Sequence, residues 1–291
     1  MRIRCEMKRE PEGARQLDCW IRSARSASTS AWRAARSLMV LLLPVMTSCK
    51  IRPPTPYWIE THGQAVGVRI AGWSNGVLLV DGNHQLWTYP GHWSQPWLTQ
   101  GTTRGLRMVT ASKAVAYGVT NEDKLFRFTG NQWLSYKGAE GESISEIAVT
   151  DDDRLLLLVD GKLKELRSQN LEGLDCDSIS GVAVTGGAAN EAYVVDQNGA
   201  LYLDAMGRCS PVPAPARLRR IAGRPDRLLA VGADGSIWRR RANTWARLPA
   251  PTKYRAGHTA RETRADDIAL SAYTTWLLDD EGSVFVLSDE T

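Results

Sequence analysis

The stretch LRRIAGRPDRLLAVGADGSIWRRRANTWARLP, from Leu218 to Pro249, decides the fold of this chain. It holds four short strand-like segments, and the turn residues Ala233-Asp234-Gly235 separate the second segment from the third. Asp and Gly suit such a turn because they tolerate the positive backbone φ that a tight hairpin demands. The stretch therefore predicts one four-stranded antiparallel sheet.

The same unit recurs about six times along the chain. In each copy an acidic or amide residue opens the turn before the third strand, and Gly follows it in all copies but one. The pairs are Asp81-Gly82, Glu122-Asp123, Asp160-Gly161, Asn198-Gly199, Asp234-Gly235 and Glu281-Gly282. Their second residues lie 36 to 47 residues apart, a period typical of propeller blades. A β-sandwich with coincidental turns is the weaker alternative.

The first strand of each unit contains a β-branched residue followed by a small one. The pairs are Ile70-Ala71, Val109-Thr110, Ile147-Ala148, Val182-Ala183, Ile221-Ala222 and Ile268-Ala269. Small residues are expected where the inner strands of all blades crowd around one axis. We therefore expect an all-β chain, a six-bladed β-propeller of four-stranded antiparallel blades over residues 57–291.

The ends of this region predict how the ring closes. The sixth unit reaches Thr291 without a fourth strand, whereas a lone strand-like segment, Tyr57-Trp58-Ile59, precedes the first unit. We expect this segment to pair beside Val284 to Leu287 and complete the last blade. Such pairing removes an exposed sheet edge.

The first 48 residues are expected to be a signal segment that is removed. They hold nine Arg or Lys residues against four acidic ones, and they include an apolar run from Leu38 to Met46. Thr47-Ser48-Cys49 follows this run. A basic region, a short apolar core and small residues are typical of an export signal, and the run is too short to span a bilayer as a helix.

The residues around Cys49 resemble a bacterial lipoprotein signal, in which an apolar residue, two small residues and Cys form a lipobox. The resemblance implies that Cys49 becomes the lipidated first residue of the mature protein. Lys50 in the next position favours the outer membrane by the sorting rule of enteric bacteria. The proline-rich segment 49–56 would form a stiff tether. We therefore expect an outer-membrane lipoprotein, on the periplasmic or the surface side, held to the membrane through its lipid alone.

Removal of the leader changes the charge of the chain. The whole sequence carries +4, and the nine bases and four acids of the leader leave about −1 for the rest. A nucleic-acid partner thus loses its electrostatic support. Of the cysteines, Cys176 and Cys209 remain unassigned. They either pair as a disulfide in an oxidising compartment or leave Cys209 as an ordinary buried apolar residue.

Charge is uneven among the predicted blades. Residues 217–248 carry nine Arg against two Asp, whereas residues 139–176 hold ten acids, including Asp151-Asp152-Asp153, against four bases. The planar guanidinium of Arg suits carboxylates and phosphates. An acidic envelope protein or a polyanionic glycan such as lipopolysaccharide is therefore the expected partner, and a merely solvated rim is the alternative. The candidate binding residues are Arg239, Arg240, Arg241, Lys253, Tyr254, Arg255, His258 and Arg261, with Trp73 and Trp97 as aromatic faces for a sugar.

Catalytic signals are weak. The four histidines, His62, His84, His92 and His258, are scattered, and no metal-binding spacing, nucleophile elbow or dinucleotide fingerprint is present. We therefore expect no catalytic residues, no metal and no cofactor. A propeller hydrolase or oxidoreductase with an active site at the channel mouth is the alternative, and its candidate acids are Glu142, Asp177 and Asp267.

The repeat itself, an apolar pair, an Asp-Gly turn, an aromatic residue and then Asn-x-Trp, looks like tectonin-type propellers. It is clearest from Ile221 to Leu248 and from Phe126 to Trp133, whereas Leu171 and Cys209 stand where the pattern has Trp. The resemblance implies a lectin-like role, with sugars or lipopolysaccharide as ligands. A lipidated propeller is also similar in plan to the scaffold lipoprotein of the outer-membrane barrel-assembly machinery. We therefore expect a non-enzymatic binding or scaffold module for protein partners or envelope glycans.

Overall fold

The structure is a computed structural model that describes residues 4–9, 15–20, 56–61, 65–73, 76–89, 98–99, 105–112, 114–129, 132–186, 191–205, 208–224, 227–253, 260–271 and 274–288. The chain separates into two units, Met1–Pro53 and Pro54–Thr291. In the first unit, β1 (Arg4–Arg9) and β2 (Arg15–Trp20) form an antiparallel hairpin that the sequence does not predict. The predicted lipobox lies outside the described residues.

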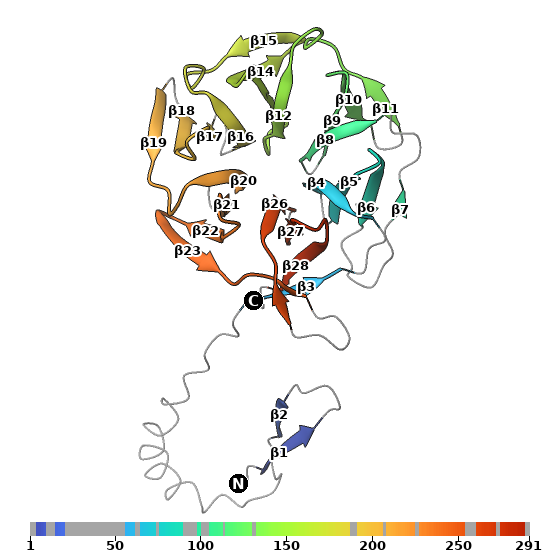
Figure 1. Ribbon diagram of the computed structural model, residues 1–291, viewed down its shortest axis with the longest axis vertical. Coiled ribbons are helices and arrows are strands. Elements are labelled where there is room, and N and C mark those ends of the chain that lie inside the picture. Colours follow the sequence, from blue (N-terminus) through green and yellow to red (C-terminus); the bar gives the residue numbers. More distant parts are fainter. Residues whose placement is uncertain are drawn as a thin grey trace, which may run out of the picture. The chain divides into compact units, whose positions relative to one another are not determined.

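The second unit is a six-bladed β-propeller, as predicted. In the described part of this unit, six four-stranded antiparallel sheets stand in a ring (Figure 1), and they exclude the sandwich alternative. No helix among the described residues is long and apolar enough to cross a membrane.

The strands follow one another from the axis outward in each blade. Blade one contains β4 (Gly67–Trp73), β5 (Gly76–Asp81), β6 (Leu86–Tyr89) and β7 (Leu98–Thr99). Blade two contains β8 (Leu106–Ala111), β9 (Ala116–Thr120), β10 (Leu125–Phe128) and β11 (Trp133–Ser135). Blade three contains β12 (Ile144–Val149), β13 (Leu155–Val159), β14 (Lys162–Arg167) and β15 (Asn170–Gly173).

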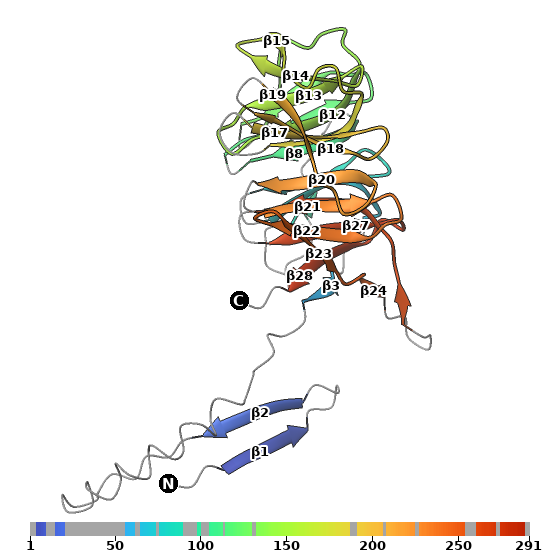
Figure 2. The same cartoon turned by 90° about the vertical axis from the view of Figure 1, so that its left-hand side faces the viewer.

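The remaining blades repeat this order. Blade four contains β16 (Gly181–Gly186), β17 (Glu191–Asp196), β18 (Leu201–Ala205) and β19 (Arg208–Val212). Blade five contains β20 (Leu218–Arg224), β21 (Arg227–Gly232), β22 (Ile237–Arg241) and β23 (Thr244–Leu248). Blade six contains β26 (Ala265–Leu270), β27 (Thr275–Asp279), β28 (Val284–Ser288) and β3 (Tyr57–Glu60). A small hairpin, β24 (Thr252–Lys253) with β25 (Arg261–Glu262), branches from the connection between blades five and six (Figure 2).

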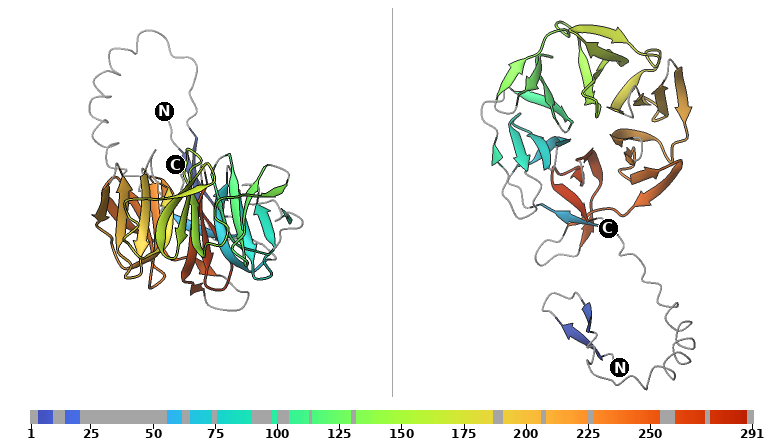
Figure 3. Two further views of the ribbon diagram at one scale, coloured as in Figure 1. Left: turned by 90° about the horizontal axis from the view of Figure 1, so that it is seen from above. Right: turned by 180° about the vertical axis from the view of Figure 1, so that it is seen from behind.

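Ring closure occurs by the predicted pairing. Strand β3 is antiparallel to β28, with Ile59 opposite Val286 and Trp58 opposite Leu287. Trp58 packs with Phe285 and Leu248 in the apolar layer between blades five and six. Figure 3 shows this strand, in blue, beside the red strands of the last blade. The ring is therefore closed by one blade built from distant parts of the chain.

Each inner strand carries a β-bulge near its start, and this bulge corrects one prediction. In blade one the shift lies between Gly67 and Arg69, and in blade four it lies between Gly181 and Ala183. Counted from the bulge, the equivalent of Ile70-Ala71 in blade four is Val184-Thr185, so the predicted pair Val182-Ala183 is wrong by two residues. A bulge adds a residue to one strand only, and sequence spacing cannot show where it falls.

The inner strands crowd at their far ends, as the small residues predict. A Cβ built at Gly72 would lie 2.1 Å from the carbonyl oxygen of Leu270 in blade six. Only glycine allows the two backbones to approach so closely. We call the face of the disc where the inner strands begin the entry face, and the face where they end the exit face.

Outer strands are tied to the segment that enters their blade, here named the incoming connection. In blade five the indole nitrogen of Trp245 donates to the carbonyl oxygen of Pro213 at 2.8 Å, and in blade six Trp58 donates to Pro249 at 2.8 Å. Cys209 occupies the equivalent place in blade four, since it lies opposite Asp204 as Trp245 lies opposite Arg240.

A disulfide takes over this contact in blade four. Cys209 is bonded to Cys176, which is fully buried in the incoming connection, and the two Cα atoms lie 5.0 Å apart. Thus, the entrance of the blade and its outer strand come close enough to meet disulfide geometry.

Candidate functional site

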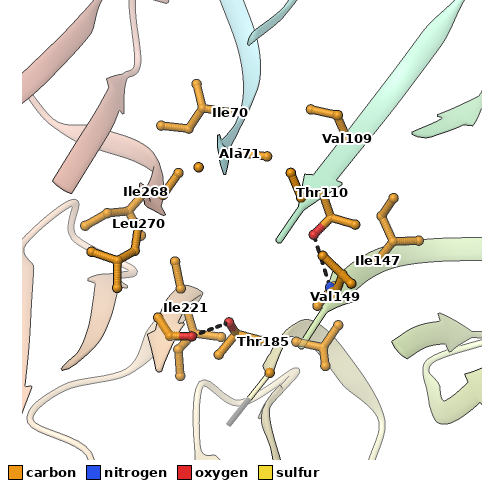
Figure 4. A pocket seen from close by; sticks show the side chains of 18 of the residues that line it. Ile70, Ala71, Val109, Thr110, Ile147, Val149, Thr185, Ile221, Ile268 and Leu270 are labelled. Atoms are coloured by element: carbon orange, nitrogen blue, oxygen red, sulfur yellow. Dashed lines mark hydrogen bonds between the residues drawn. The ribbon is translucent and has the colours of Figure 1, made fainter. Parts of the chain in front are cut away.

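A channel runs along the propeller axis between the six inner strands. Its cavity has a volume of about 110 Å³. Figure 4 looks into this space, with Ile70, Thr110, Ile221 and other labelled side chains around it. The Thr110 hydroxyl accepts a hydrogen bond from the backbone N–H of Val149 at 3.2 Å, so this hydroxyl links blade two to blade three.

Four charged side chains surround the channel near the entry face, and we call them the channel quartet: Arg69, Glu146, Arg220 and Asp267. Each is the third residue of its inner strand, in blades one, three, five and six. The Glu146 carboxylate lies 3.5 Å from a guanidinium nitrogen of Arg69 and 3.6 Å from one of Arg220. The Asp267 carboxylate lies 3.9 Å from Arg69 and 4.0 Å from Arg220. Each acid therefore faces both arginines, and the four formal charges cancel.

Burial controls the electrostatics of the quartet. It raises the pKa of Glu146, although the charges of Arg69 and Arg220 act in the opposite direction. For Arg69, burial alone would lower the pKa, but the charges of Glu146 and Asp267 more than offset it and leave this pKa raised. The Asp267 carboxylate also accepts backbone N–H bonds from Ile70 at 3.2 Å and Ile268 at 2.9 Å. The quartet is thus fixed to the inner strands at its acidic members.

The sequence predicted only one quartet member as a channel residue, Asp267. Of the other two candidate acids, Glu142 lies 3.6 Å from Lys164 and Asp177 is exposed, and neither lines the channel. A signal for the missed members was present. Each quartet residue directly precedes an Ile-Ala pair of an inner strand, a place that the strand geometry turns toward the axis.

The second candidate region is the exit-face end of blade five, here called the arginine end: Arg224, Arg227, Arg239, Arg240 and Arg241. It spans three adjacent strands, because Arg224 on β20 lies opposite Arg227 on β21, and Leu228 beside it lies opposite Arg240 on β22. Arg241 is exposed, and Arg239 and Arg240 are half-buried. Arg227 donates to the hydroxyl of Thr275 in blade six at 2.8 Å, and Arg240 donates to Asn243 at 3.0 Å.

The acidic triplet lies on the same exit face, in blade three. Asp151, Asp152 and Asp153 form the turn after β12, and all three are exposed. Two of them bind neighbouring hydroxyls, Asp152 that of Thr150 at 2.5 Å and Asp153 that of Ser112 at 2.6 Å. The exit face therefore carries positive charge over blade five and negative charge over blade three. Over the described ranges, no cluster of three or more His, Cys, Asp or Glu could hold a metal ion.

The remaining predicted binding residues have mostly structural contacts. The Lys253 ammonium is buried and lies 2.7 Å from both Asp279 and Glu281 of blade six. Arg261 is exposed and lies 3.3 Å from Glu281. Lys253 is thus part of the attachment of the β24–β25 hairpin to blade six, and its charge is already satisfied inside the protein.

Among the aromatic candidates, the structure describes Trp73. Trp73 is half-buried and packs edge-on against Phe128, with ring centroids 5.6 Å apart. Its ring thus helps to join blades one and two. Four further candidates lie outside the described residues: Tyr254, Arg255, His258 and Trp97.

No protein-family model matches this chain, and no curated protein matches it. Solved structures do match. YCF48 bound to a D1 peptide is 11% identical with a TM-score of 0.56, and the match covers 83% of this chain and 98% of that one. Human WBSCR16 is 12% identical with a TM-score of 0.52, covering 80% and 79%. YCF48 from Cyanidioschyzon merolae is 10% identical with a TM-score of 0.51, covering 79% and 98%. At such identities these matches show the propeller fold alone.

Proposed function

We propose that this protein is a non-enzymatic binding or scaffold module of the bacterial cell envelope, anchored through a lipid on Cys49. Its partner in this proposal is an envelope protein that presents an acidic segment to the arginine end of blade five. A polyanionic glycan such as lipopolysaccharide is the second candidate ligand, because phosphates and carboxylates offer arginine the same kind of acceptor.

The observation that carries this proposal is the placement of arginines on three of the four strands at one end of blade five. Arg241 is exposed at the end of β22, with Arg240 before it on the same strand, and Arg227 and Arg224 lie on β21 and β20. Elsewhere in the same blade, Arg219 forms an ion pair with Asp266 at 2.7 Å, and Arg220 belongs to the channel quartet. An acidic segment on the arginine end would also be kept from blade three by the like charge of its Asp turn, which sets its position.

A protein partner is favoured over a sugar. Trp73, the described aromatic candidate for stacking on a sugar, has its ring engaged by Phe128. In addition, a propeller of the same fold, YCF48, has been solved with a D1 peptide bound. Propellers use exposed loops and strand ends on a rigid ring for such contacts.

Catalysis in the channel receives less support. An acid–base pair needs groups whose protonation states differ and a reacting atom between them. In the described channel lining, Glu146 and Asp267 do not take two different roles, since each carboxyl group faces both Arg69 and Arg220. A non-enzymatic role is therefore part of the proposal.

Export from the cytosol is supported by the disulfide of blade four. Cys176 and Cys209 are bonded, and Cys176 is fully buried. Disulfides persist mainly in oxidising compartments such as the periplasm. The lipidated, outer-membrane form further rests on the lipobox resemblance at Cys49.

The binding proposal is tested with a fluorescent oligo-glutamate peptide and with lipopolysaccharide in parallel. The triple variant Arg239→Gln, Arg240→Gln, Arg241→Gln is compared with a control that removes the same charge at exposed Arg127, Arg208 and Arg247. We expect the arginine-end variant to weaken peptide binding about tenfold or more and the control to change it less than about twofold. Equal weakening by both variants would mean that only net charge matters. Selective loss of lipopolysaccharide binding would assign the surface to the glycan.

The anchor is tested by metabolic labelling with an alkyne fatty acid in a bacterial host. Wild-type protein should take up label and partition with membranes, and Cys49→Ala should do neither. Absence of label on the wild-type protein would overturn the proposed lipid anchor, and it would not affect the binding proposal for the arginine end.

A further inference from the structure

The channel quartet is charge-balanced but loosely joined. Its four nitrogen–oxygen separations, 3.5 to 4.0 Å, exceed the roughly 2.7–2.9 Å of a charge-assisted hydrogen bond. The Nε of Arg220 is buried without a hydrogen-bond partner in the described part of the chain. Buried guanidinium and carboxylate groups normally complete their hydrogen bonds. The four side chains line the channel and keep 10 to 26% of their surface exposed, so charged groups of both signs remain accessible there.

Space beside the quartet is sufficient for a small molecule. The channel cavity measures about 110 Å³, whereas about 10–15 Å³ by a comparable measure holds one water molecule. Its walls next to the quartet are short side chains, Ala71, Ala222 and Ala269 among them. A ligand of a few non-hydrogen atoms fits this volume, and a long side chain or a sugar ring with substituents does not.

The balance of charge selects among small ligands. A single anion would pair with Arg69 and Arg220 but would bring its charge against Glu146 and Asp267, and a single cation would meet the opposite conflict. Within a buried site, unpaired like charges are costly. A ligand with one carboxylate and one ammonium group can satisfy both signs and leave the site neutral.

We propose that the channel quartet binds a small zwitterion of the α-amino acid class. The ligand carboxylate lies between the guanidinium groups of Arg69 and Arg220, and its ammonium group lies between the carboxylates of Glu146 and Asp267. Only a small ligand side chain is accommodated, because the channel cavity measures about 110 Å³. This site is separate from the arginine end of blade five and does not depend on the function proposed for it.

The test uses the purified full chain and isothermal titration calorimetry, supported by saturation-transfer NMR. Glycine and alanine are the zwitterionic probes, and acetate and methylammonium carry one charge each at comparable size. We expect saturable binding of glycine or alanine, and about tenfold or weaker binding of either single ion. Tryptophan serves as a size control and should not bind.

Two variants locate the site. Arg69→Gln with Glu146→Gln removes one charge of each sign and keeps the net charge, and we expect it to weaken glycine binding about tenfold or more. The matched control Arg219→Gln with Asp266→Gln breaks a neighbouring ion pair outside the channel lining and should leave binding unchanged. Thermal unfolding of each variant establishes that it is folded. Absence of glycine and alanine binding to wild-type protein at millimolar concentration, equal binding of acetate or methylammonium, or unchanged binding in the channel variant would each overturn the proposal.

Discussion

In blades four and five, the same position of the outer strand is attached to the incoming connection. The attachment is a disulfide in blade four and a hydrogen bond in blade five. In blade five, Trp245 donates one hydrogen bond to the carbonyl of Pro213 and packs its ring in the layer toward blade four. In blade four, Cys209 stands in this place and is bonded covalently to Cys176. Blade six follows blade five, with Trp58 bonded to Pro249.

The difference teaches that a repeat position can be conserved in geometry while its residue changes. Both contacts, the tryptophan hydrogen bond and the disulfide, attach the outer strand of a blade to the segment that enters the blade. Each therefore stabilises the outer strand in its sheet. A tryptophan does so by filling volume and donating one bond. A disulfide stabilises the blade in a different way, because the cross-link reduces the conformational entropy of the unfolded chain. The two kinds of contact should therefore respond differently to mutation, reductant and pH.

The largest effect is expected for Trp58→Ala. Trp58 is buried in the strand that closes the ring, and its removal leaves a cavity between blades five and six. Truncating a buried Trp costs about 3–5 kcal/mol of unfolding free energy. Chemical denaturation of the full chain measures this loss. A change below about 1 kcal/mol would show that the ring does not depend on β3.

Loss of the disulfide should rank second. Cys176 and Cys209 are separated by 33 residues, and a cross-link over a loop of this length stabilises by about 2–4 kcal/mol. We expect the double variant Cys176→Ser, Cys209→Ser to unfold at correspondingly lower denaturant concentration. Reductant should shift the wild-type protein by the same amount and leave the double variant unchanged. Resistance of the wild-type protein to reductant under unfolding conditions would contradict the assignment.

The contrast between these blades also marks what the sequence could predict. The turn pairs predicted the blade number, because it depends on local spacing. The lone segment Tyr57-Trp58-Ile59 predicted the closure, because the sixth unit has no fourth strand of its own. The pair of blade four was misplaced, because Val182-Ala183 and Val184-Thr185 have the same pattern and only the bulge distinguishes them. Local pattern does not contain that information.

The candidate sites were less predictable for a different reason. The channel quartet joins Arg69 to Asp267, residues far apart in the sequence that meet only because the ring closes. Lys253 looked like a free binding residue, since the partners that neutralise it, Asp279 and Glu281, come from the next blade. Charge counting along the chain does not show which charged side chains meet an opposite charge from another blade.

A third prediction isolates the hydrogen bond of the tryptophan contact. Trp245→Phe removes the donor to Pro213 but retains an aromatic ring, and we expect a loss of about 1 kcal/mol beyond that of a matched variant. The match is Trp133→Phe, at the equivalent place in blade two. Its buried indole nitrogen has no hydrogen-bond partner in the described structure. The unfolding free energies of the two variants are compared, and equal losses would mean that only ring volume matters.

The smallest effect on stability at neutral pH is expected for the ion pairs of Lys253, which attach the connection into blade six to Asp279 and Glu281. Burial alone would lower the pKa of Lys253, but hydrogen bonds and charges from Asp279 and Glu281 more than offset it and raise this pKa above 10.5. A raised folded-state pKa means that the stabilisation is complete below the unfolded value of 10.5 and is lost as pH rises through the folded value.

We therefore expect stability to be insensitive to this pair from neutral pH to about pH 10 and to fall above it. Denaturation across this range measures the effect. The double variant Lys253→Met, Asp279→Asn should show a shallower alkaline decline, because it removes the titrating cation together with the buried acid that would otherwise be left unpaired. Blade four offers the internal contrast: its disulfide carries no titrating charge, so the double variant Cys176→Ser, Cys209→Ser should keep the alkaline decline of the wild-type protein. If stability falls as steeply with pH in the Lys253 variant as in the wild-type protein, another group is responsible for the decline. Tyr89 and Tyr117 are then the groups to test, because burial raises their pKa values to about 12.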